Sequence, residues 1–125
     1  MARTVLIVED GDNVAPLEIA LASLDGIRVL VLPDGRDALA LLRADPADLA
    51  AIVTDLHLPH VDGFELVEAV RADRRYSHVP IVVVSGDSHP DVPNRLRHLG
   101  ADAFFSKPYS PAEIRQTLEG LLHAS

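Results

Sequence analysis

The chain has 125 residues, no cysteine and a formal net charge of −8, from 11 basic and 19 acidic residues. Disulfides and thiolate metal sites are therefore excluded, and the negative charge argues against nonspecific binding to nucleic acid or to anionic membranes. No apolar run approaches the roughly 18 residues that a membrane span needs, and the first residues lead directly into a strand-like run rather than a signal peptide. We expect one cytoplasmic domain over residues 1–125, since this length suits a single domain and 48% of the residues are apolar.

Short apolar runs alternate with helical periodicity in the first half of the chain. Residues 4–8 form a first buried strand, and residues 9–13 form a polar loop. A first helix of about three turns is predicted by apolar residues at helical spacing, namely Val14, Leu17, Leu21 and Leu24. Residues 27–32 contain a second strand, and Asp34 is a candidate N-cap for a second helix, which ends at Asp45 because Pro46 follows.

The second half of the chain continues the alternation. Residues 51–55 form a third strand, and the Asp62-Gly63-Phe64-Glu65 segment predicts a capping box at the start of a third helix. Residues 80–85 form the fourth strand. Two prolines predict a short fourth helix, which starts between Pro90 and Pro93 and ends at Gly100.

A fifth strand at residues 103–106 and a fifth helix complete the chain. The Ser110-Pro111-Ala112-Glu113 segment predicts a second capping box with proline at the first helical position. Five strands that alternate with five helices indicate an α/β fold with a parallel sheet covered on both faces. The expected architecture is a flavodoxin-like, doubly wound, three-layer αβα fold with strand order 2-1-3-4-5.

Polar residues stand where four of the predicted strands end. They are Glu9 and Asp10, then Asp55, then Ser85, and finally Lys107. The expected strand order brings these carboxyl ends to one edge of the sheet, where ligands bind in open α/β folds. Crowded carboxylates repel one another unless a cation intervenes, and hard oxygen ligands suit Mg²⁺. The lysine adds a positive charge that suits phosphate. Together these five residues indicate a site for phosphoryl transfer to a carboxylate nucleophile.

These residues make the chain resemble the receiver domain of a two-component response regulator, of the CheY-like superfamily. The resemblance covers nearly the whole chain. It rests on an acidic pair after the first strand, an aspartate after the third, a serine after the fourth and a Lys-Pro pair after the fifth. Those positions are Glu9 and Asp10, Asp55, Ser85, and Lys107-Pro108.

The resemblance implies a role for each of these positions. Asp55 accepts a phosphoryl group from a histidine kinase or a histidine phosphotransfer protein, with Ser85 and Lys107 contacting the phosphate. The implied ligands of Mg²⁺ are the side chains of Glu9, Asp10 and Asp55 and the backbone carbonyl of His57.

The resemblance also implies how a signal leaves the domain. Ser85 and Phe104 act as the switch, and the surface of the fourth helix, fifth strand and fifth helix changes on phosphorylation. The partners are then a downstream effector or fused output domain, and a second copy of the chain on that surface. The peptide bond before Pro108 is a cis candidate, and His57 and Asp87 occupy positions that tune phosphoryl lifetime in the family.

Simpler interpretations exist for each residue taken alone. Asp55 or the Glu9-Asp10 pair could cap a turn or helix, Ser85 could merely end a strand, and Lys107 could be a solvated lysine. Phe104 could be an ordinary core residue, and we interpret Phe64 and Phe105 as core. All six histidines lack metal-binding spacing and are expected at the surface: His57, His60, His78, His89, His98 and His123.

Three other functions compete with this interpretation of the whole chain. A haloacid-dehalogenase-type phosphatase needs a second aspartate two residues after the nucleophile, where this chain has His57. A flavin or nucleotide binder needs a glycine-rich first loop, whereas the loop after the first strand is acidic. The remaining alternative is an atypical receiver that works as a protein-interaction module without phosphorylation. We expect no enzyme activity beyond the chain's own phosphorylation and dephosphorylation.

Overall fold

The computed structural model describes residues 3–11 and 14–123, and its centre is a parallel sheet of five strands in the order β2-β1-β3-β4-β5. The predicted strand order is therefore confirmed. Residues 12 and 13 of the predicted polar loop lie outside the described residues. The elements follow one another as β1 (Arg3–Val8), α1 (Ala15–Ala22), β2 (Ile27–Leu32), α2 (Gly35–Arg43), β3 (Leu49–Asp55), α3 (Gly63–Ala72), η1 (Arg74–Tyr76), β4 (Ile81–Ser85), α4 (Val92–Leu99), β5 (Ala103–Ser106) and α5 (Pro111–His123).

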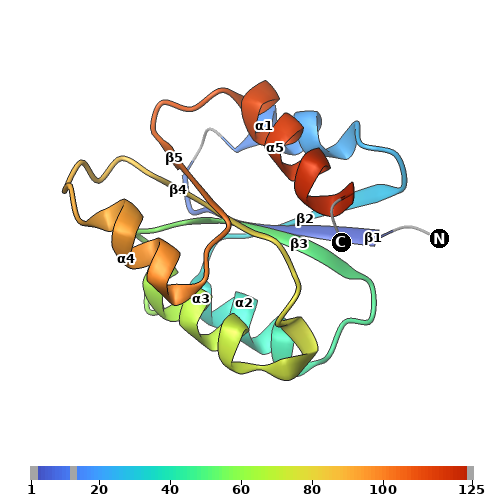
Figure 1. The fold of residues 1–125 in the computed structure, drawn as a ribbon. Helices are drawn as coiled ribbons and strands as arrows, with labels where there is room; N and C mark the ends of the chain where they lie inside the picture. The colour runs from blue at the N-terminus through green and yellow to red at the C-terminus, as the bar shows by residue number, and fades with distance from the viewer. Residues whose placement is uncertain (1–2, 12–13, 124–125) are drawn as a thin grey trace.

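Helices cover both faces of the sheet, as Figure 1 shows: α1 and α5 lie over one face, and α2, α3 and α4 lie over the other. Side chains alternate between the faces along each strand, because successive residues of a strand point to opposite sides. In β1, Val5 and Ile7 pack with α1 and α5, whereas Leu6 and Val8 pack with α2, α3 and α4. The central strands therefore have two buried faces, which explains their continuous apolar runs.

Three helix ends follow the predicted local chemistry, and of the capping box predicted at α5 the structure shows the Glu113 N–H donating to Ser110 Oγ at 3.3 Å. Asp34 caps α2 by accepting the Arg36 N–H at 2.8 Å. The capping box of α3 is complete: Asp62 accepts the Glu65 N–H at 2.9 Å, and Glu65 accepts the Asp62 N–H at 3.5 Å. Gly100 ends α4 with a φ of 109°, in the left-handed region that favours glycine.

Three details differ from the sequence prediction. Helix α1 has only eight residues, about two turns, and ends before Leu24, which is nevertheless buried. Phe64 and Phe105 are half-buried rather than fully in the core, because each packs at the margin of a helix-covered face. Phe64 instead holds the Arg95 guanidinium over its ring at 3.9 Å.

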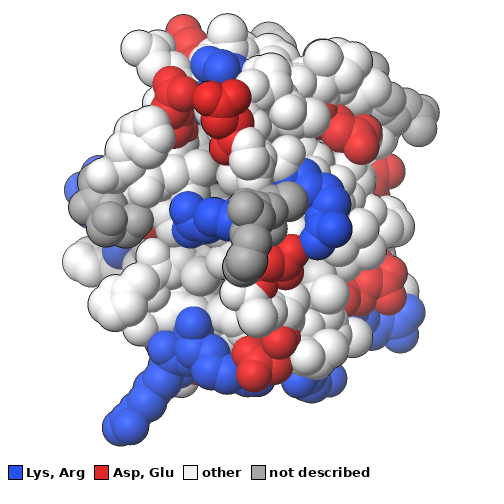
Figure 2. Space-filling model, turned by 90° about the vertical axis from the view of Figure 1, so that its right-hand side faces the viewer, with Lys and Arg blue, Asp and Glu red and all other residues white. Residues whose placement is uncertain are grey.

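Charge of both signs is distributed over the surface. Figure 2 shows the side at which the strands begin, where acidic and basic side chains are interspersed and neither sign covers the face. This distribution gives no support to a broad cationic surface there. Among the described residues, none of the helices combines the length and the apolar character that crossing a membrane requires.

Candidate functional site

The candidate site lies at the edge of the sheet where β1, β3, β4 and β5 end. In the register of the sheet, Asp55 at the end of β3 pairs with Val84 on β4, and Ser85 pairs with Ser106 on β5. The backbone N–H of Lys107 donates to the carbonyl of Ser85 at 2.9 Å, which extends the β4–β5 pairing by one residue. Parallel pairing thus places residues from distant parts of the chain at one edge.

Three carboxylates meet at this edge. Carboxylate oxygens of Glu9, Asp10 and Asp55 all lie within 4.8 Å of one another. Glu9 and Asp55 are buried, with 7% and 6% of their surface exposed, whereas Asp10 is exposed. The cluster therefore has two enclosed acids and one that faces solvent.

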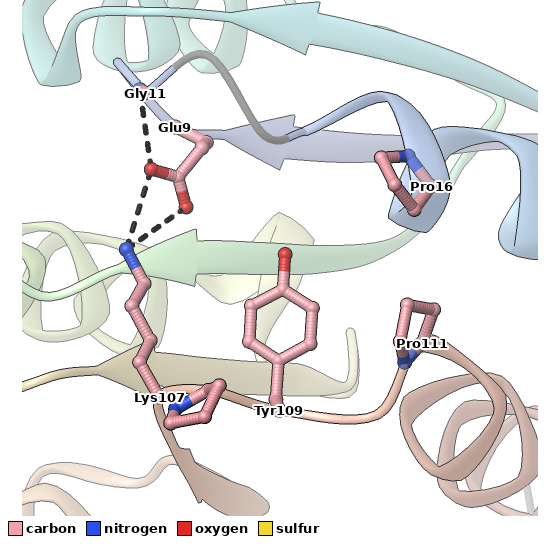
Figure 3. A pocket seen from close by; sticks show the side chains of 7 residues that line it. Glu9, Gly11, Pro16, Lys107, Tyr109 and Pro111 are labelled. Atoms are coloured by element: carbon pink, nitrogen blue, oxygen red, sulfur yellow. Dashed lines mark hydrogen bonds and ion pairs between the residues drawn. The ribbon is translucent and has the colours of Figure 1, made fainter.

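Lys107 supplies the positive charge of the cluster. Its Nζ lies 2.5 Å from Asp55 Oδ2 and 3.4 Å from both carboxylate oxygens of Glu9. Figure 3 shows the lysine reaching from the segment after β5 toward Glu9, whose Oε1 also accepts the Gly11 N–H at 3.2 Å. The lysine is thus a member of the cluster, although its side chain stays partly exposed to solvent.

Burial and crowding alter the protonation of the cluster. The pKa of Glu9 is raised, chiefly because burial disfavours its charged form and also because the charge of Asp55 lies close, with Lys107 acting in the opposite direction. Burial also disfavours the charged form of Lys107, but its hydrogen bonds and charge interactions with Asp55 and Glu9 outweigh this, and its pKa is raised. Burial and the neighbouring charge of Asp55 thus outweigh the effect of Lys107 on the pKa of Glu9.

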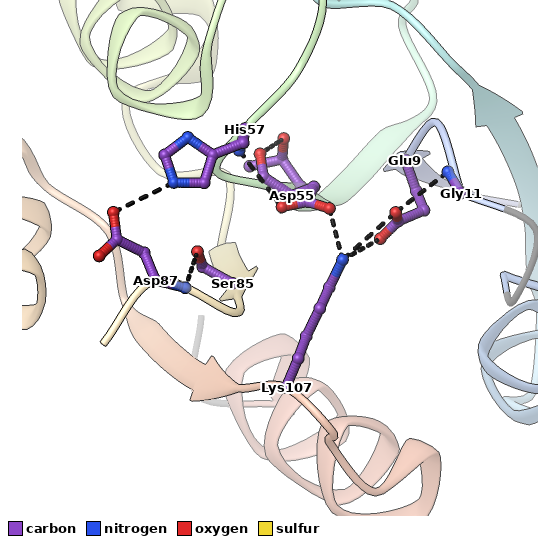
Figure 4. Close-up of polar contacts among 8 residues, drawn as sticks. Glu9, Gly11, Asp55, His57, Ser85, Asp87 and Lys107 are labelled. Carbon is purple, nitrogen blue, oxygen red and sulfur yellow. Dashed lines mark hydrogen bonds and ion pairs between the residues drawn. The ribbon is translucent and has the colours of Figure 1, made fainter. Parts of the chain in front are cut away.

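A second set of contacts joins the loops after β3 and β4. Figure 4 shows His57 and Asp87 facing each other beside Asp55, with His57 Nε2 3.1 Å from Asp87 Oδ2. The His57 N–H donates to Asp55 Oδ1 at 3.3 Å, and the Asp87 N–H donates to Ser85 Oγ at 3.0 Å. Ser85 is fully buried, and all six histidines are exposed as predicted.

A glycine allows α3 to begin directly against the end of β3. A Cβ on Gly63 would lie 2.7 Å from the backbone carbonyl oxygen of Asp55, closer than Cβ contacts allow. The Gly63 N–H donates to the Leu56 carbonyl at 2.7 Å. Glycine at position 63 therefore lets the backbone at the start of α3 lie this close to the end of β3.

The remaining predicted positions lie around this cluster. Phe104 is half-buried against the core on the α4 side, and it lines a hollow with Pro93 and Leu96. The Lys107–Pro108 peptide bond is cis. Sequence reasoning missed Tyr109, which lies beside Glu9 and Lys107, although an aromatic residue directly after the Lys-Pro pair could have signalled it.

The donor set fits a hard divalent cation. Its three side-chain ligands are all carboxylates, and carboxylate oxygens together with water are what Mg²⁺ takes in proteins. The raised pKa of Glu9 reflects burial first and the nearby charge of Asp55 second, and a bound cation would favour the charged form of Glu9. The residues present therefore suit Mg²⁺.

A parallel five-stranded αβα fold with this acidic cleft is the architecture of a receiver domain. The family model of the response regulator receiver domain matches residues 5–119, and the chain belongs to that family. A curated relative, the polar-differentiation response regulator DivK of Brucella ovis, is 30% identical over 122 residues, covering 98% of both chains. Receiver domains are signalling modules of two-component systems, and this chain is therefore such a signalling module.

Solved structures of receivers agree with this assignment. The receiver domain of the sensor histidine kinase PA1611 from Pseudomonas aeruginosa, solved with a magnesium ion coordinated in the active-site cleft, has a TM-score of 0.83 and 27% identity, over 98% of this chain and 99% of that one. A putative response regulator from Chloroflexus aurantiacus has a TM-score of 0.86 and 27% identity, over 98% and 99%. The phosphorylated cyanobacterial phytochrome response regulator RcpA has a TM-score of 0.81 and 25% identity, over 97% and 91%.

Proposed function

We propose that this chain is a cytoplasmic phosphoacceptor receiver whose Asp55 takes a phosphoryl group from the phosphohistidine of a histidine kinase or a histidine phosphotransfer protein. The observation that carries the proposal is the contact of Lys107 Nζ with Asp55 Oδ2 at 2.5 Å inside a cluster of three carboxylates. This arrangement supports a nucleophilic carboxylate held in place by a cation that can also contact phosphate.

The chemistry follows from the positions of the side chains. Asp55 attacks phosphorus, the P–N bond to the donor imidazole breaks, and its electron pair stays on the imidazole nitrogen. The carboxylates of Glu9, Asp10 and Asp55 are the groups that would hold Mg²⁺. The resemblance to receiver domains adds the backbone carbonyl of His57 to this set. When bound, the ion supplies positive charge against the phosphoryl oxygens. Lys107 contacts the transferred group, and Ser85 offers it a hydroxyl.

Signalling then depends on a two-state equilibrium. A phosphoryl group adds a charge of roughly −1.5 to −2 to the cleft. Ser85 shifts toward this charge and gives up its contact with the Asp87 N–H, and Phe104 moves into the vacated space. The surface of α4, β5 and α5 changes, and an effector, a fused output domain or a second copy of the chain reads the change.

The test uses acetyl phosphate with Mg²⁺ and intact-mass measurement after acid quench. We expect one added phosphoryl group in the parent protein, none in Asp55→Asn, and normal addition in Asp25→Asn, a control that removes an exposed carboxylate. In NMR spectra with BeF₃⁻, shifts should extend through α4, β5 and α5. An unchanged mass together with no BeF₃⁻ binding would refute the proposal and favour a receiver that works without phosphorylation.

A further inference from the structure

The loop between β3 and α3 contains a strained turn at His60. Its φ is 67°, in the left-handed region that residues other than glycine rarely adopt. The Val61 N–H donates to the Pro59 carbonyl at 2.7 Å, and this hydrogen bond closes a three-residue γ-turn centred on His60. A γ-turn with a positive φ at its centre is the rare and strained form. Such a conformation persists only where neighbouring contacts hold it in place.

The turn before α2 supplies such contacts. His60 Nδ1 lies 2.7 Å from Asp34 Oδ2, and the ionised carboxylate can only accept, so the histidine donates. The side chain of Asp34 is 16% exposed and that of His60 is 51% exposed, so the acceptor is the more enclosed partner. Gly35 lies directly against the same loop, because a Cβ there would be 2.1 Å from the Val61 carbonyl oxygen. The β3–α3 loop is therefore supported at two adjacent residues.

Another part of this loop contacts the candidate phosphoacceptor. The His57 N–H donates to Asp55 Oδ1 at 3.3 Å (Figure 4), whereas Lys107 Nζ contacts Oδ2 at 2.5 Å. The two oxygens of Asp55 are thus held by different segments, one by the backbone of the β3–α3 loop and the other by the lysine after β5. The orientation of this carboxylate therefore depends in part on the conformation of the loop.

The loop is anchored at both of its ends. The Leu56 N–H donates to the Val84 carbonyl at 3.1 Å, and the Gly63 N–H donates to the Leu56 carbonyl at 2.7 Å. Because the ends are fixed, a change of φ at His60 has to be absorbed by the residues between them, and His57 is one of these. Relaxation of the strained turn would therefore displace the His57 N–H.

We propose that His60, held by Asp34, is a positioning residue for the phosphorylation of Asp55. The contact between His60 and Asp34 keeps the strained turn in place, and the turn keeps the His57 N–H against Asp55 Oδ1. The inference rests on the proposed function and adds to it a pair of residues that do not touch the reacting atoms. The transfer reaction is unchanged, and the contact alters only how often Asp55 is presented in the orientation seen here.

The test measures the rate constant of phosphorylation by acetyl phosphate at saturating Mg²⁺, from intact mass after acid quench. His60→Ala removes the contact but keeps a Cβ, and with it the strain of a positive φ. Asp34→Ser keeps a residue that can cap α2, whose shorter side chain has one oxygen for the cap and none for His60. His60→Gly removes the contact and the strain together.

Two further proteins complete the set. The double variant of His60→Ala and Asp34→Ser tests whether the two residues act through each other. His78→Ala is the matched control, since it removes an exposed histidine just before β4, whereas the candidate site lies where the strands end. Urea unfolding of every variant verifies that any loss of rate is measured on folded protein.

We expect the rate constant to fall about three- to tenfold in His60→Ala and in Asp34→Ser, because the lost hydrogen bond and the strain that it opposes are similar in size. The double variant should lie within about twofold of the single variants, since both changes remove the same contact. His60→Gly should stay within about twofold of the parent, because glycine adopts a positive φ without strain. His78→Ala should also stay within about twofold.

Three results would each overturn the inference. The first is a rate constant in His60→Ala equal to that of the parent. The second is a double variant in which the two single losses multiply, since the residues would then act separately. The third is a loss in His60→Gly as large as that in His60→Ala, since the strained turn would then have no part in the effect. If His60→Ala does not fold, Asp34→Ser is judged by the first criterion.

Failure of the proposed function has a different signature. A parent protein that acetyl phosphate does not phosphorylate refutes the proposed function, and the inference falls with it. A parent that is phosphorylated at a rate indifferent to residues 34 and 60 leaves the proposed function intact and refutes the positioning role alone.

Discussion

Magnesium should stabilise this protein strongly, because the candidate site carries unbalanced charge. Three carboxylates and the ammonium of Lys107 leave two net negative charges, which one divalent cation would neutralise. An ion that binds only the folded state at one hundred times its Kd adds about 2.7 kcal/mol to the free energy of unfolding. The unfolding entropy of a 125-residue chain is about 0.26 kcal/mol/K. The Tm should therefore rise by about 10 °C.

The assay is thermal unfolding followed by far-UV circular dichroism, in MgCl₂ and then after EDTA is added. Removal of a residue that hydrogen-bonds to a metal ligand lowers metal affinity by about 10- to 100-fold, and removal of a ligand itself should lower the affinity at least as much. Asp10→Asn removes the exposed carboxylate of the cluster, and Asp10 is not part of the core. At the same magnesium concentration, its Tm shift should therefore be smaller by about 5 °C or more.

Asp25→Asn is the matched control, since it removes an exposed carboxylate that is not part of the cluster, and it should keep the full response. The reasoning is refuted if NaCl at equal ionic strength raises the Tm of the parent as much as MgCl₂ does. It is also refuted if Asp10→Asn and the parent respond alike to magnesium.

Two further predictions concern the fold and its pH dependence. Gly35→Ala places a Cβ 2.1 Å from the Val61 carbonyl oxygen, and it should lower the free energy of unfolding measured in urea by about 1–3 kcal/mol. Gly120 has open space around it, so Gly120→Ala should raise the free energy of unfolding by up to about 1 kcal/mol. Equal effects of the two substitutions would contradict the packing argument. The hydrogen bond from the Arg36 N–H, together with His60, lowers the pKa of Asp34 below its ordinary value of 3.8. Ionised Asp34 therefore stabilises the folded state above about pH 3.8, and this stabilisation is lost as the pH falls through the lower pKa of the folded state. The Tm difference between the parent and Asp34→Asn should narrow from about pH 6 to about pH 3, and a constant difference would disprove this charge effect.

Local patterns in the sequence determined the elements and most of their ends. The β-branched runs, the Asp62–Glu65 capping box and the glycine at the end of α4 depend on chemistry within a few residues. The strand order followed from the alternation of strands and helices, because this topology has few solutions. The candidate site residues could be found because each one lies at or just after the end of a strand, and parallel strands bring their carboxyl ends to one edge.

Only the tertiary structure decided which groups touch. The reach of Lys107 to Asp55 and the pairing of His57 with Asp87 depend on how loops from different strands meet, and no local pattern encodes that. The same holds for the partial exposure of Phe64, which depends on where the edges of the packed helices fall. The sequence therefore determined the elements and the acids at their ends, because those depend on neighbouring residues. The contact between His60 and Asp34 and the balance of charge in the cleft arise from contacts between distant segments, which exist only in the folded chain.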